Sequence, residues 1–278
     1  MLLDCHTHTA NSPDGQNTVA EHCERAIELG LKAMAITDHC EVNRYYEAEH
    51  YEIRPDEKYH DYNFKVCYEN SLVETARAKE IYKGKLNLIC GIELGQSAYD
   101  AELSEKLISD DRIDFVIGSL HELPGRDDFA FIDYTKEDVN KLMEQNFTEI
   151  LNMCHLGKFD VLGHLTYALR YASNYGVKID LKPFDEIITD IFRAVIFNGK
   201  GIEINTSGLR QKYGKTFPTY EYIKLYRDLG GEIITIGSDA HTTEDLGKGI
   251  SDGIALAKKA GFNRIAYFIK RKPHFINI

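Results

Sequence analysis

Short apolar runs alternate with longer amphipathic segments along the chain. Each run is rich in Val, Ile and Leu and is nearly continuous rather than alternating, which is typical of strands buried on both faces of a parallel sheet. The strands predicted in this way are Leu2–Cys5, Ala33–Thr37, Leu86–Ile92, Phe115–Ser119, Asp160–Gly163, Gly201–Asn205 and Glu232–Gly237.

Helix signals fall between these strands. Thr18 and Glu21 have the spacing of a capping box, and Gly30 is placed to end the helix that follows. Further helices are predicted from Thr135 to Gly157, from Pro183 to Gly199, from Pro218 to Gly230, over 71–83 and over about 250–260. Strands and helices therefore alternate without a break in composition. We predict one α/β barrel-like domain over residues 1–278, with a doubly wound open sheet as the structural alternative.

The charge balance bears on which partners the chain can have. Lys and Arg number 33 against 44 Asp and Glu, so the formal net charge is −11. Such a surface repels nucleic acid and anionic lipid unless positive charge is gathered locally or supplied by metal. We therefore expect no nucleic-acid partner and no membrane partner.

The cysteines and the apolar segments bear on the compartment. The six cysteines include no CxxC pair, and neither a secretory signal nor a membrane-spanning apolar stretch is found. We expect reduced thiols and a cytoplasmic location. A homodimer is compatible with the sequence, which does not fix the oligomeric state.

Histidines and carboxylates gather where the predicted strands end. Side chains at i and i+2 of a strand point the same way, so His6 should converge with His8, and Asp239 with His241. The carboxyl ends of parallel barrel strands share one rim, and imidazole with carboxylate is the ligand set of zinc, iron or manganese. Too many ligands are present for one tetrahedral ion, so we predict a cluster of two or three. The strand-end set is His6, His8, His39, Glu93, His121, His164, Asp239 and His241.

A single histidine at a strand end is more often a hydrogen-bonded rim residue than a metal ligand, but the whole set in order on six strands favours a metal centre. The remaining histidines are interpreted as structural or surface residues. We expect His22 to be a surface or packing residue of the first helix, and His155 to suit a helix C-terminus. His274 is expected at the surface, and His50 and His60 in an acidic loop.

The motifs HxH, TDH, GxE, a strand-end His, GH and SDAH occur in this order and resemble those of the polymerase and histidinol phosphatase (PHP) superfamily. The resemblance covers essentially the whole chain and implies a distorted (β/α)7 barrel with a trinuclear metal centre. The segments GSLHEL, DVLGHL, IEINTSGLR and IGSDAH resemble more specifically the monofunctional histidinol-phosphate phosphatases of histidine biosynthesis. Many of these read GHLD where this chain has Thr166.

The resemblance also implies how the ligands are shared among the ions. Some members have a histidine as a metal ligand where this chain has Asp14. Asp14 would be a hard ligand of one ion in the same place, or it is a turn residue of SPDG. The implied first site is His6, His8, Glu93 and Asp239, the second is Glu93, His121 and His164, and the third is Asp14, His39 and His241.

The reaction implied by the resemblance is hydrolysis of L-histidinol phosphate to L-histidinol and phosphate by metal-activated hydroxide, with Zn, Mn or Fe as the ion. Glu93 would bridge two ions and Asp239 would hold the first. Water, Asp38 or His241 would protonate the leaving oxygen; alternatively, Asp38, which precedes the ligand His39, would position the ligands. Basic residues that follow strands five and six are expected to bind the phosphate, because Arg matches its oxygens bidentately. They are Arg170, Arg210 and Lys212.

The long acidic and aromatic connection over 40–68 suggests how a cationic substrate end is recognised. Glu41, Tyr45, Tyr46 and Glu47 could contact it by charge and cation–π interaction, or the segment is a solvated loop.

Three other functions stay open. They are hydrolysis of another small phosphomonoester or nucleotide, a non-hydrolytic metal scaffold, and an amidohydrolase, which would usually carry a bridging lysine that the strand ends lack. An oligonucleotide substrate would require a basic, aromatic track, which the chain does not show.

Overall fold

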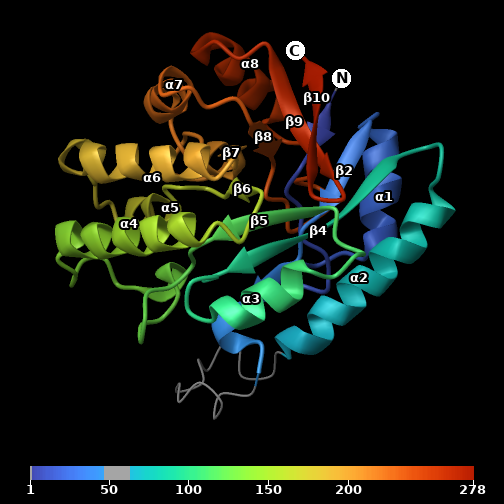
Figure 1. Cartoon of the computed structure of the whole chain (residues 1–278), viewed down its shortest axis with the longest axis horizontal. Helices are drawn as coiled ribbons and strands as arrows, with labels where there is room; N and C mark the ends of the chain where they lie inside the picture. The colour runs from blue at the N-terminus through green and yellow to red at the C-terminus, as the bar shows by residue number, and fades with distance from the viewer. Residues whose placement is uncertain (1, 47–62) are drawn as a thin grey trace.

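Parallel strands form the centre of the molecule (Figure 1). The computed structural model describes residues 2–46 and 63–278. Neighbouring strands pair in parallel, and a short strand, β3 (His39–Glu41), also pairs with β4. The order across the main sheet is β1 (Leu3–Asp4), β2 (Ala33–Ile36), β4 (Asn87–Gly95), β5 (Phe115–Ser119), β6 (Val161–Leu162), β7 (Gly201–Asn205) and β8 (Ile234–Gly237).

Main-chain hydrogen bonds join the first strand to the last. Cys5 N donates to Ile236 O over 3.0 Å, and His8 N donates to Ala240 O over 2.8 Å. The sheet is therefore a nearly closed barrel of seven parallel strands, and the open doubly wound alternative is excluded. The predicted strands are buried on both faces, as their continuous apolar runs indicated.

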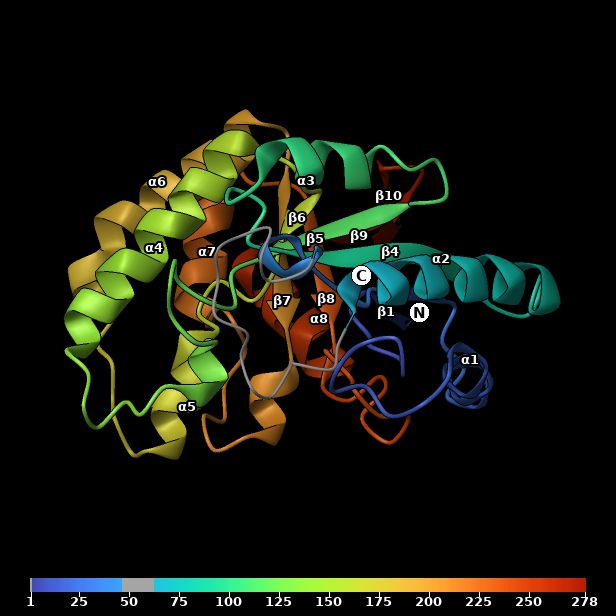
Figure 2. The same cartoon turned by 90° about the horizontal axis from the view of Figure 1, so that it is seen from below.

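Helices cover the outside of the barrel (Figure 2). Thr18 and Glu21 form the predicted capping box at the start of the first helix. Within the described residues, the helices are α1 (Val19–Glu28), α2 (Phe64–Ile81), α3 (Ala101–Ile108), α4 (Val139–Leu156), α5 (Ala168–Asn174), α6 (Asp185–Phe197), α7 (Tyr220–Asp228) and α8 (Ile250–Ala260).

Several helix predictions were wrong in detail. The second helix begins at Phe64 rather than near residue 71, because Asn63 caps it by accepting a hydrogen bond from Val66 N. Asp138, not Thr135, caps α4, since the Thr135 hydroxyl donates to Asp133 instead. The short helices α3 and α5 were not predicted.

A C-terminal hairpin was also missed. It consists of β9 (Arg264–Ile269) and β10 (Lys272–Asn277), which pair antiparallel. The Phe268 ring stacks on Phe115 at 5.0 Å, and Arg271 forms an ion pair with Asp160, which precedes β6. The hairpin therefore covers the amino-terminal end of the barrel and leaves the carboxyl ends of the strands open. Within the described residues, no helix has the length and apolar character to cross a membrane.

Candidate metal centre

The predicted ligands converge at the carboxyl ends of the strands. His6 and His8 follow β1, Glu93 lies in β4, and all three side chains are fully buried. The other members come from β3 and from the segments after β5, β6 and β8. They are His39, His121, His164, Asp239 and His241. These eight residues and Asp14 form what we call the metal centre.

One group of ligand atoms surrounds Glu93 Oε2 and Asp239 Oδ1. His6 Nε2 lies 3.4 Å from the Glu93 oxygen and 3.8 Å from the Asp239 oxygen, and His8 Nε2 lies 3.5 and 3.4 Å from the same two atoms. Asp239 has a φ of 55°, a left-handed conformation that is uncommon for a residue with a side chain and often marks a functional site. This group matches the predicted first site.

A second group shares Glu93 through its other oxygen. Glu93 Oε1 lies 2.7 Å from His164 Nε2 and 3.2 Å from His121 Nε2, and the two imidazole nitrogens are 3.4 Å apart. Since one carboxylate presents its two oxygens to two clusters of imidazoles, Glu93 has the geometry of a bridging ligand.

The third group is nearer to solvent. His241 Nε2 lies 3.1 Å from Asp14 Oδ2, and His39 Nε2 lies 3.6 Å from Asp14 Oδ1. The Asp14 side chain is half exposed, and the neighbouring histidines lower its pKa even though burial opposes its ionisation. Asp14 therefore faces both histidines, as the prediction of a third site requires.

The spacing of these atoms fits metal ions. Ligand atoms at about 2.1 Å from a tetrahedral ion lie roughly 3.4 Å from one another. Glu93 Oε2 and His39 Nδ1 are buried and lie 2.9 Å apart, and among the described residues neither atom forms a well-aligned hydrogen bond. Buried polar atoms without partners are costly, so their convergence here is consistent with ions as the missing partners.

Three of the ligand histidines also have the orientation that metal binding needs. His6 Nδ1 lies 2.7 Å from Glu203 Oε1, His8 Nδ1 lies 3.2 Å from Ser12 Oγ, and His121 Nδ1 lies 2.9 Å from Glu41 Oε1. Donation of Nδ1–H to these oxygens leaves the Nε2 lone pair of each ring directed into the metal centre. Such outer partners are typical of metal-binding histidines.

Neither of the two outer carboxylates, Glu203 and Glu41, was predicted from the sequence to contact a ligand histidine. Glu203 was not singled out, although its Oε2 also accepts a hydrogen bond from His164 N over 3.0 Å. Glu41, suggested as a contact of the cationic substrate end, faces His121 Nδ1 and also lines the cavity beside the metal centre. A Cβ on Gly237 would lie 2.4 Å from Glu203 Oε1 and 2.3 Å from His6 Cβ, so the glycine of IGSDAH is required for this packing.

Asp38 does not have the contacts of a proton donor. Its carboxylate accepts hydrogen bonds from the Thr9 main chain and hydroxyl, from Ser12 Oγ over 2.8 Å and from Ser71 Oγ over 2.6 Å. Because every contact is a donor to the carboxylate, Asp38 serves as a hydrogen-bond acceptor here and orients Ser12, which in turn contacts His8. These contacts favour a positioning role over the predicted role as an acid.

The electrostatics of the metal centre favour ionised carboxylates. Burial opposes ionisation of Glu93, but His121 and His6 hold its pKa well below the usual range. Arg170 and His6 do the same for the pKa of Asp239. Burial and the nearby His241 and His39 lower the pKa of His8 well below 6.5, which keeps that imidazole neutral.

The three predicted phosphate-binding residues occupy different places. Arg170 is buried and donates to Asp239 Oδ2 over 2.6 Å and to Ser207 Oγ. Arg210 donates to the carbonyls of Ser238 over 2.9 Å and Asp239 over 3.4 Å, so it lies against the strand end that carries Asp239. Lys212 Nζ instead donates to Asn174 O and lines a different groove, so its position does not support phosphate binding.

A cavity of about 240 Å³ opens over the second and third groups. Several of its lining residues were not singled out from the sequence, because they come from loops with no recognisable motif. Burial raises the pKa of one of them, Asp128, to about 6. The cavity is lined, apart from the metal centre, mainly by Arg44, Phe64, Glu122, Asp128, Phe131, Tyr167 and Tyr171.

Tyr45, predicted to contact the substrate, is buried against Tyr68 and Tyr46 and does not line this cavity. The predicted residues Glu47, His50 and His60 lie outside the described residues.

Among the histidines set apart from the site, His22 is fully buried and is therefore a packing residue. His155 lies exposed in the last turn of α4, and His274 is exposed on β10. All three agree with the structural or surface roles expected for them.

Comparison with known proteins identifies relatives of this chain. The chain is 28% identical to a probable histidinol-phosphatase of Thermotoga maritima, over 95% of both chains. It is equally similar to the histidinol-phosphatase of Lactococcus lactis, over 96% of this chain and 94% of the relative. The solved structure of histidinol phosphate phosphatase from Lactococcus lactis, in complex with zinc, L-histidinol and phosphate, superposes with a TM-score of 0.79 at 23% identity, covering 98% of both chains. The model of the PHP domain matches residues 4–207, and the chain therefore belongs to the PHP domain family.

Proposed function

We propose that this protein is a metal-dependent phosphomonoesterase that hydrolyses L-histidinol phosphate to L-histidinol and phosphate, a reaction of histidine biosynthesis. The observation that carries the proposal is the convergence of His6, His8, Glu93, Asp239 and their neighbours, whose ligand atoms lie at distances that suit metal ions. The full-length relatives named histidinol-phosphatase support the choice of substrate.

Three groups of residues would hold the ions, and zinc is the first candidate because the Lactococcus lactis structure contains it. When bound, divalent ions neutralise phosphate charge, activate water for attack on phosphorus and stabilise the leaving oxygen. The proposed ligands are those of the three groups: His6, His8, Glu93 and Asp239; Glu93, His121 and His164; and Asp14, His39 and His241.

The chain's own residues would prepare this chemistry. Glu203 and Ser12 fix the rings of His6 and His8, so the ligands need no reorientation during the reaction. Arg170 and Arg210 bring positive charge beside Asp239, where phosphoryl oxygens would lie. Since both oxygens of Asp38 already accept hydrogen bonds and His241 is assigned as a ligand, water is our candidate for the proton donor to the leaving oxygen.

The cavity beside the metal centre suits a cationic substrate end. Its wall includes Asp128 and Glu122 together with the rings of Tyr167 and Tyr171. Carboxylates attract an ammonium or imidazolium group, and aromatic faces add cation–π attraction. We place this recognition here rather than on Tyr45, which is buried elsewhere.

We place the reaction in the cytoplasm, because all six cysteines are unpaired, and free thiols are typical of reducing compartments.

The test is a substrate panel with the zinc-loaded protein. It compares kcat/KM for L-histidinol phosphate, p-nitrophenyl phosphate, a sugar phosphate and a nucleoside monophosphate. We expect L-histidinol phosphate to exceed the others by at least about 10²-fold, the scale of two well-placed polar contacts. Preference for the nucleotide or the sugar phosphate would assign another substrate, and bound zinc without any hydrolysis would indicate a binding scaffold.

A further inference from the structure

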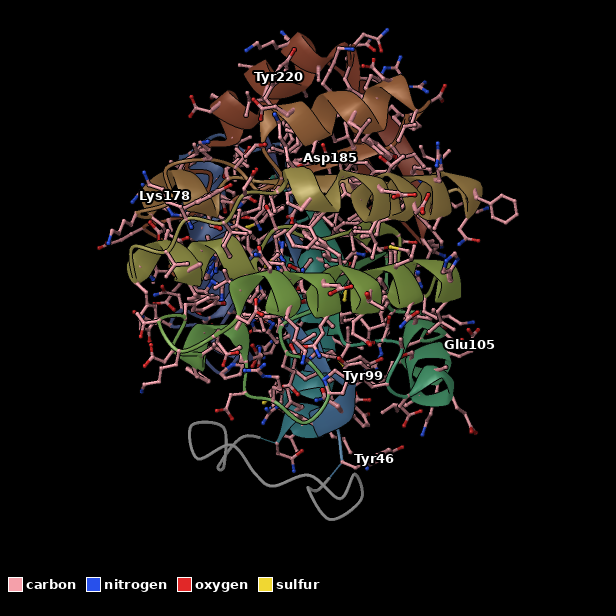
Figure 3. All side chains as sticks on the ribbon, turned by 90° about the vertical axis from the view of Figure 1, so that its left-hand side faces the viewer. Tyr46, Tyr99, Glu105, Lys178, Asp185 and Tyr220 are labelled. Carbon is pink, nitrogen blue, oxygen red and sulfur yellow. The ribbon has the colours of Figure 1, made fainter. Side chains whose placement is uncertain are left out.

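A second and larger groove lies on the face formed by α5, α6, α7 and the segment over 206–217. Figure 3 views this face and labels Lys178, Asp185 and Tyr220 on it. The volume of the groove is about 1000 Å³, and it shares no lining residue with the cavity at the metal centre. This size lies at the upper end of the range for small-molecule sites.

The groove combines an apolar floor with a basic rim. The floor includes Leu169, Ala172, Val177, Leu181, Tyr213 and Leu225. The rim carries Lys178, Lys182, Lys212 and Lys215, all exposed. Four lysines around one groove are notable in a chain whose net charge is −11.

The four lysines outnumber by one the acids that line the same groove, which are Asp180, Asp185 and Glu221. Among the described residues, none of the four lysines has a carboxylate oxygen within 4.0 Å, and Lys212 contacts only a main-chain carbonyl. These carboxylates have neutral partners nearby. Asp180 accepts from Lys182 N, Asp185 accepts from the Tyr222 hydroxyl over 2.8 Å, and a hydrogen bond with Thr219, helped by the charge of Lys215, lowers the pKa of Glu221. The rim therefore presents ammonium groups that are available to an anion.

We propose that this groove binds an amphipathic organic anion of metabolite size, and that its occupancy alters the metal centre. The apolar body of the ligand would cover the floor, and its carboxylate, sulfonate or phosphate group would meet the lysines. Charge attraction alone is weak at an exposed rim, so the apolar floor is needed for useful affinity.

The walls of the groove lead directly to Arg170. Leu169 and Ala172 flank Arg170 on α5, and Tyr213 stacks on Phe217 with ring centroids 4.9 Å apart. The Phe217 ring lies 5.4 Å from the Arg170 guanidinium, which holds Asp239. A ligand that touches both α5 and Tyr213 therefore contacts the two surfaces that fix this arginine.

The binding test uses the fluorescent anion 8-anilinonaphthalene-1-sulfonate as probe. With the zinc-loaded protein, we expect a saturable fluorescence increase and a Kd at least about 10-fold higher in the Lys178→Glu/Lys215→Glu variant, from the loss of two attractive charges and the gain of two repulsive ones. A control variant, Lys83→Glu/Lys85→Glu, carries the same charge change in the turn after α2, on the opposite side of the molecule (Figure 2), and should leave the Kd unchanged. Leu225→Trp, which fills the floor without changing charge, should also weaken binding.

The second arm measures p-nitrophenyl phosphate hydrolysis with and without the probe, and this arm rests on the proposed function. We expect the probe to change KM or kcat at least about twofold in the wild type and in the control variant, but not in Lys178→Glu/Lys215→Glu. A twofold change corresponds to a modest coupling free energy between the two sites. Probe binding that is equal in all variants would overturn the site. Groove binding that leaves the kinetics of an active enzyme unchanged would overturn the coupling. Binding needs no catalysis, so a protein without phosphatase activity would refute the proposed function and leave the site supported.

Discussion

Arg170 donates from its guanidinium to Asp239 Oδ2 over 2.6 Å, while the other oxygen of the same carboxylate faces His8 Nε2 at 3.4 Å. The two oxygens of Asp239 thus have different tasks, one held by the arginine and one directed into the metal centre. The rings of Tyr167, Tyr171 and Phe217 surround the guanidinium and shield this ion pair from water.

Replacement of Arg170 should lower catalysis. We expect Arg170→Ala to reduce kcat/KM on L-histidinol phosphate by about 10²–10³, because Asp239 loses its orientation and the phosphate loses a nearby positive charge. Arg170→Lys should recover only part of the loss, since an ammonium lacks the planar fork. Steady-state kinetics beside the exposed control Arg193→Ala would check this, and normal kinetics in Arg170→Ala would contradict it.

The outer carboxylate Glu203 should control metal affinity. Glu203→Gln keeps the shape of the side chain but removes the charge that polarises His6, so we expect zinc to bind about 10–100-fold more weakly. Competition with a chromophoric chelator would measure the affinity. The exposed substitution Glu232→Gln, which affects only a surface pair with Arg264, serves as control. Equal zinc affinity in wild type and Glu203→Gln would refute the role of Glu203.

Asp14 should be needed for the third ion only. Asp14→Ala removes the carboxylate between His39 and His241, so elemental analysis should find about one ion fewer per chain while the two sites at Glu93 stay filled. The exposed substitution Asp111→Ala should leave the metal content unchanged. Full metal content together with normal activity in Asp14→Ala would make Asp14 a turn residue.

The buried carboxylate of Asp128 should lower the free energy of unfolding at neutral pH. Burial raises its pKa from 3.8 to about 6, so below about pH 3 the side chain is mostly protonated in both the folded and the unfolded state and carries almost no penalty. As pH rises to 6, the unfolded chain ionises first and stability falls, by up to about 3 kcal/mol. In chelator-stripped protein, Asp128→Asn should therefore raise Tm at pH 7.5 and change it little at pH 4.

The same variant tests the proposed cationic subsite. Loss of the Asp128 charge should raise KM for L-histidinol phosphate while p-nitrophenyl phosphate, which has no cationic group, is hydrolysed as before. A Tm difference that does not depend on pH, or equal effects on both substrates, would argue against the role given to Asp128.

The barrel and the metal centre could be predicted because local sequence determines them. Continuous apolar runs mark buried parallel strands, and His6, His8 and Glu93 occupy the ends of such runs, where the barrel topology must bring them together. The β9–β10 hairpin was not predicted because it is partly exposed and follows closely after a helix. Its turn, at Lys270 and Arg271, also lacks the glycine or asparagine that usually marks a hairpin turn.

The residues that were missed act through contacts that no local pattern reports. Glu203 lies inside the apolar strand β7, where an isolated acid has no motif, and only the barrel places it beside His6. Asp128 and Tyr167 meet across loops far apart in the sequence. Arg170 was singled out for phosphate, but its partner Asp239 could not be named before the packing of α5 was known.

The most direct test of the account is to titrate chelator-stripped protein with zinc while measuring both bound metal and hydrolysis of L-histidinol phosphate. Activity should be absent without metal and rise as about two to three ions bind per chain. Glu93→Gln, which removes the charge shared by the first two sites, should bind less zinc and lose at least about 10³-fold in kcat. Full activity in the presence of chelator, with less than about one ion bound per chain, would contradict the account.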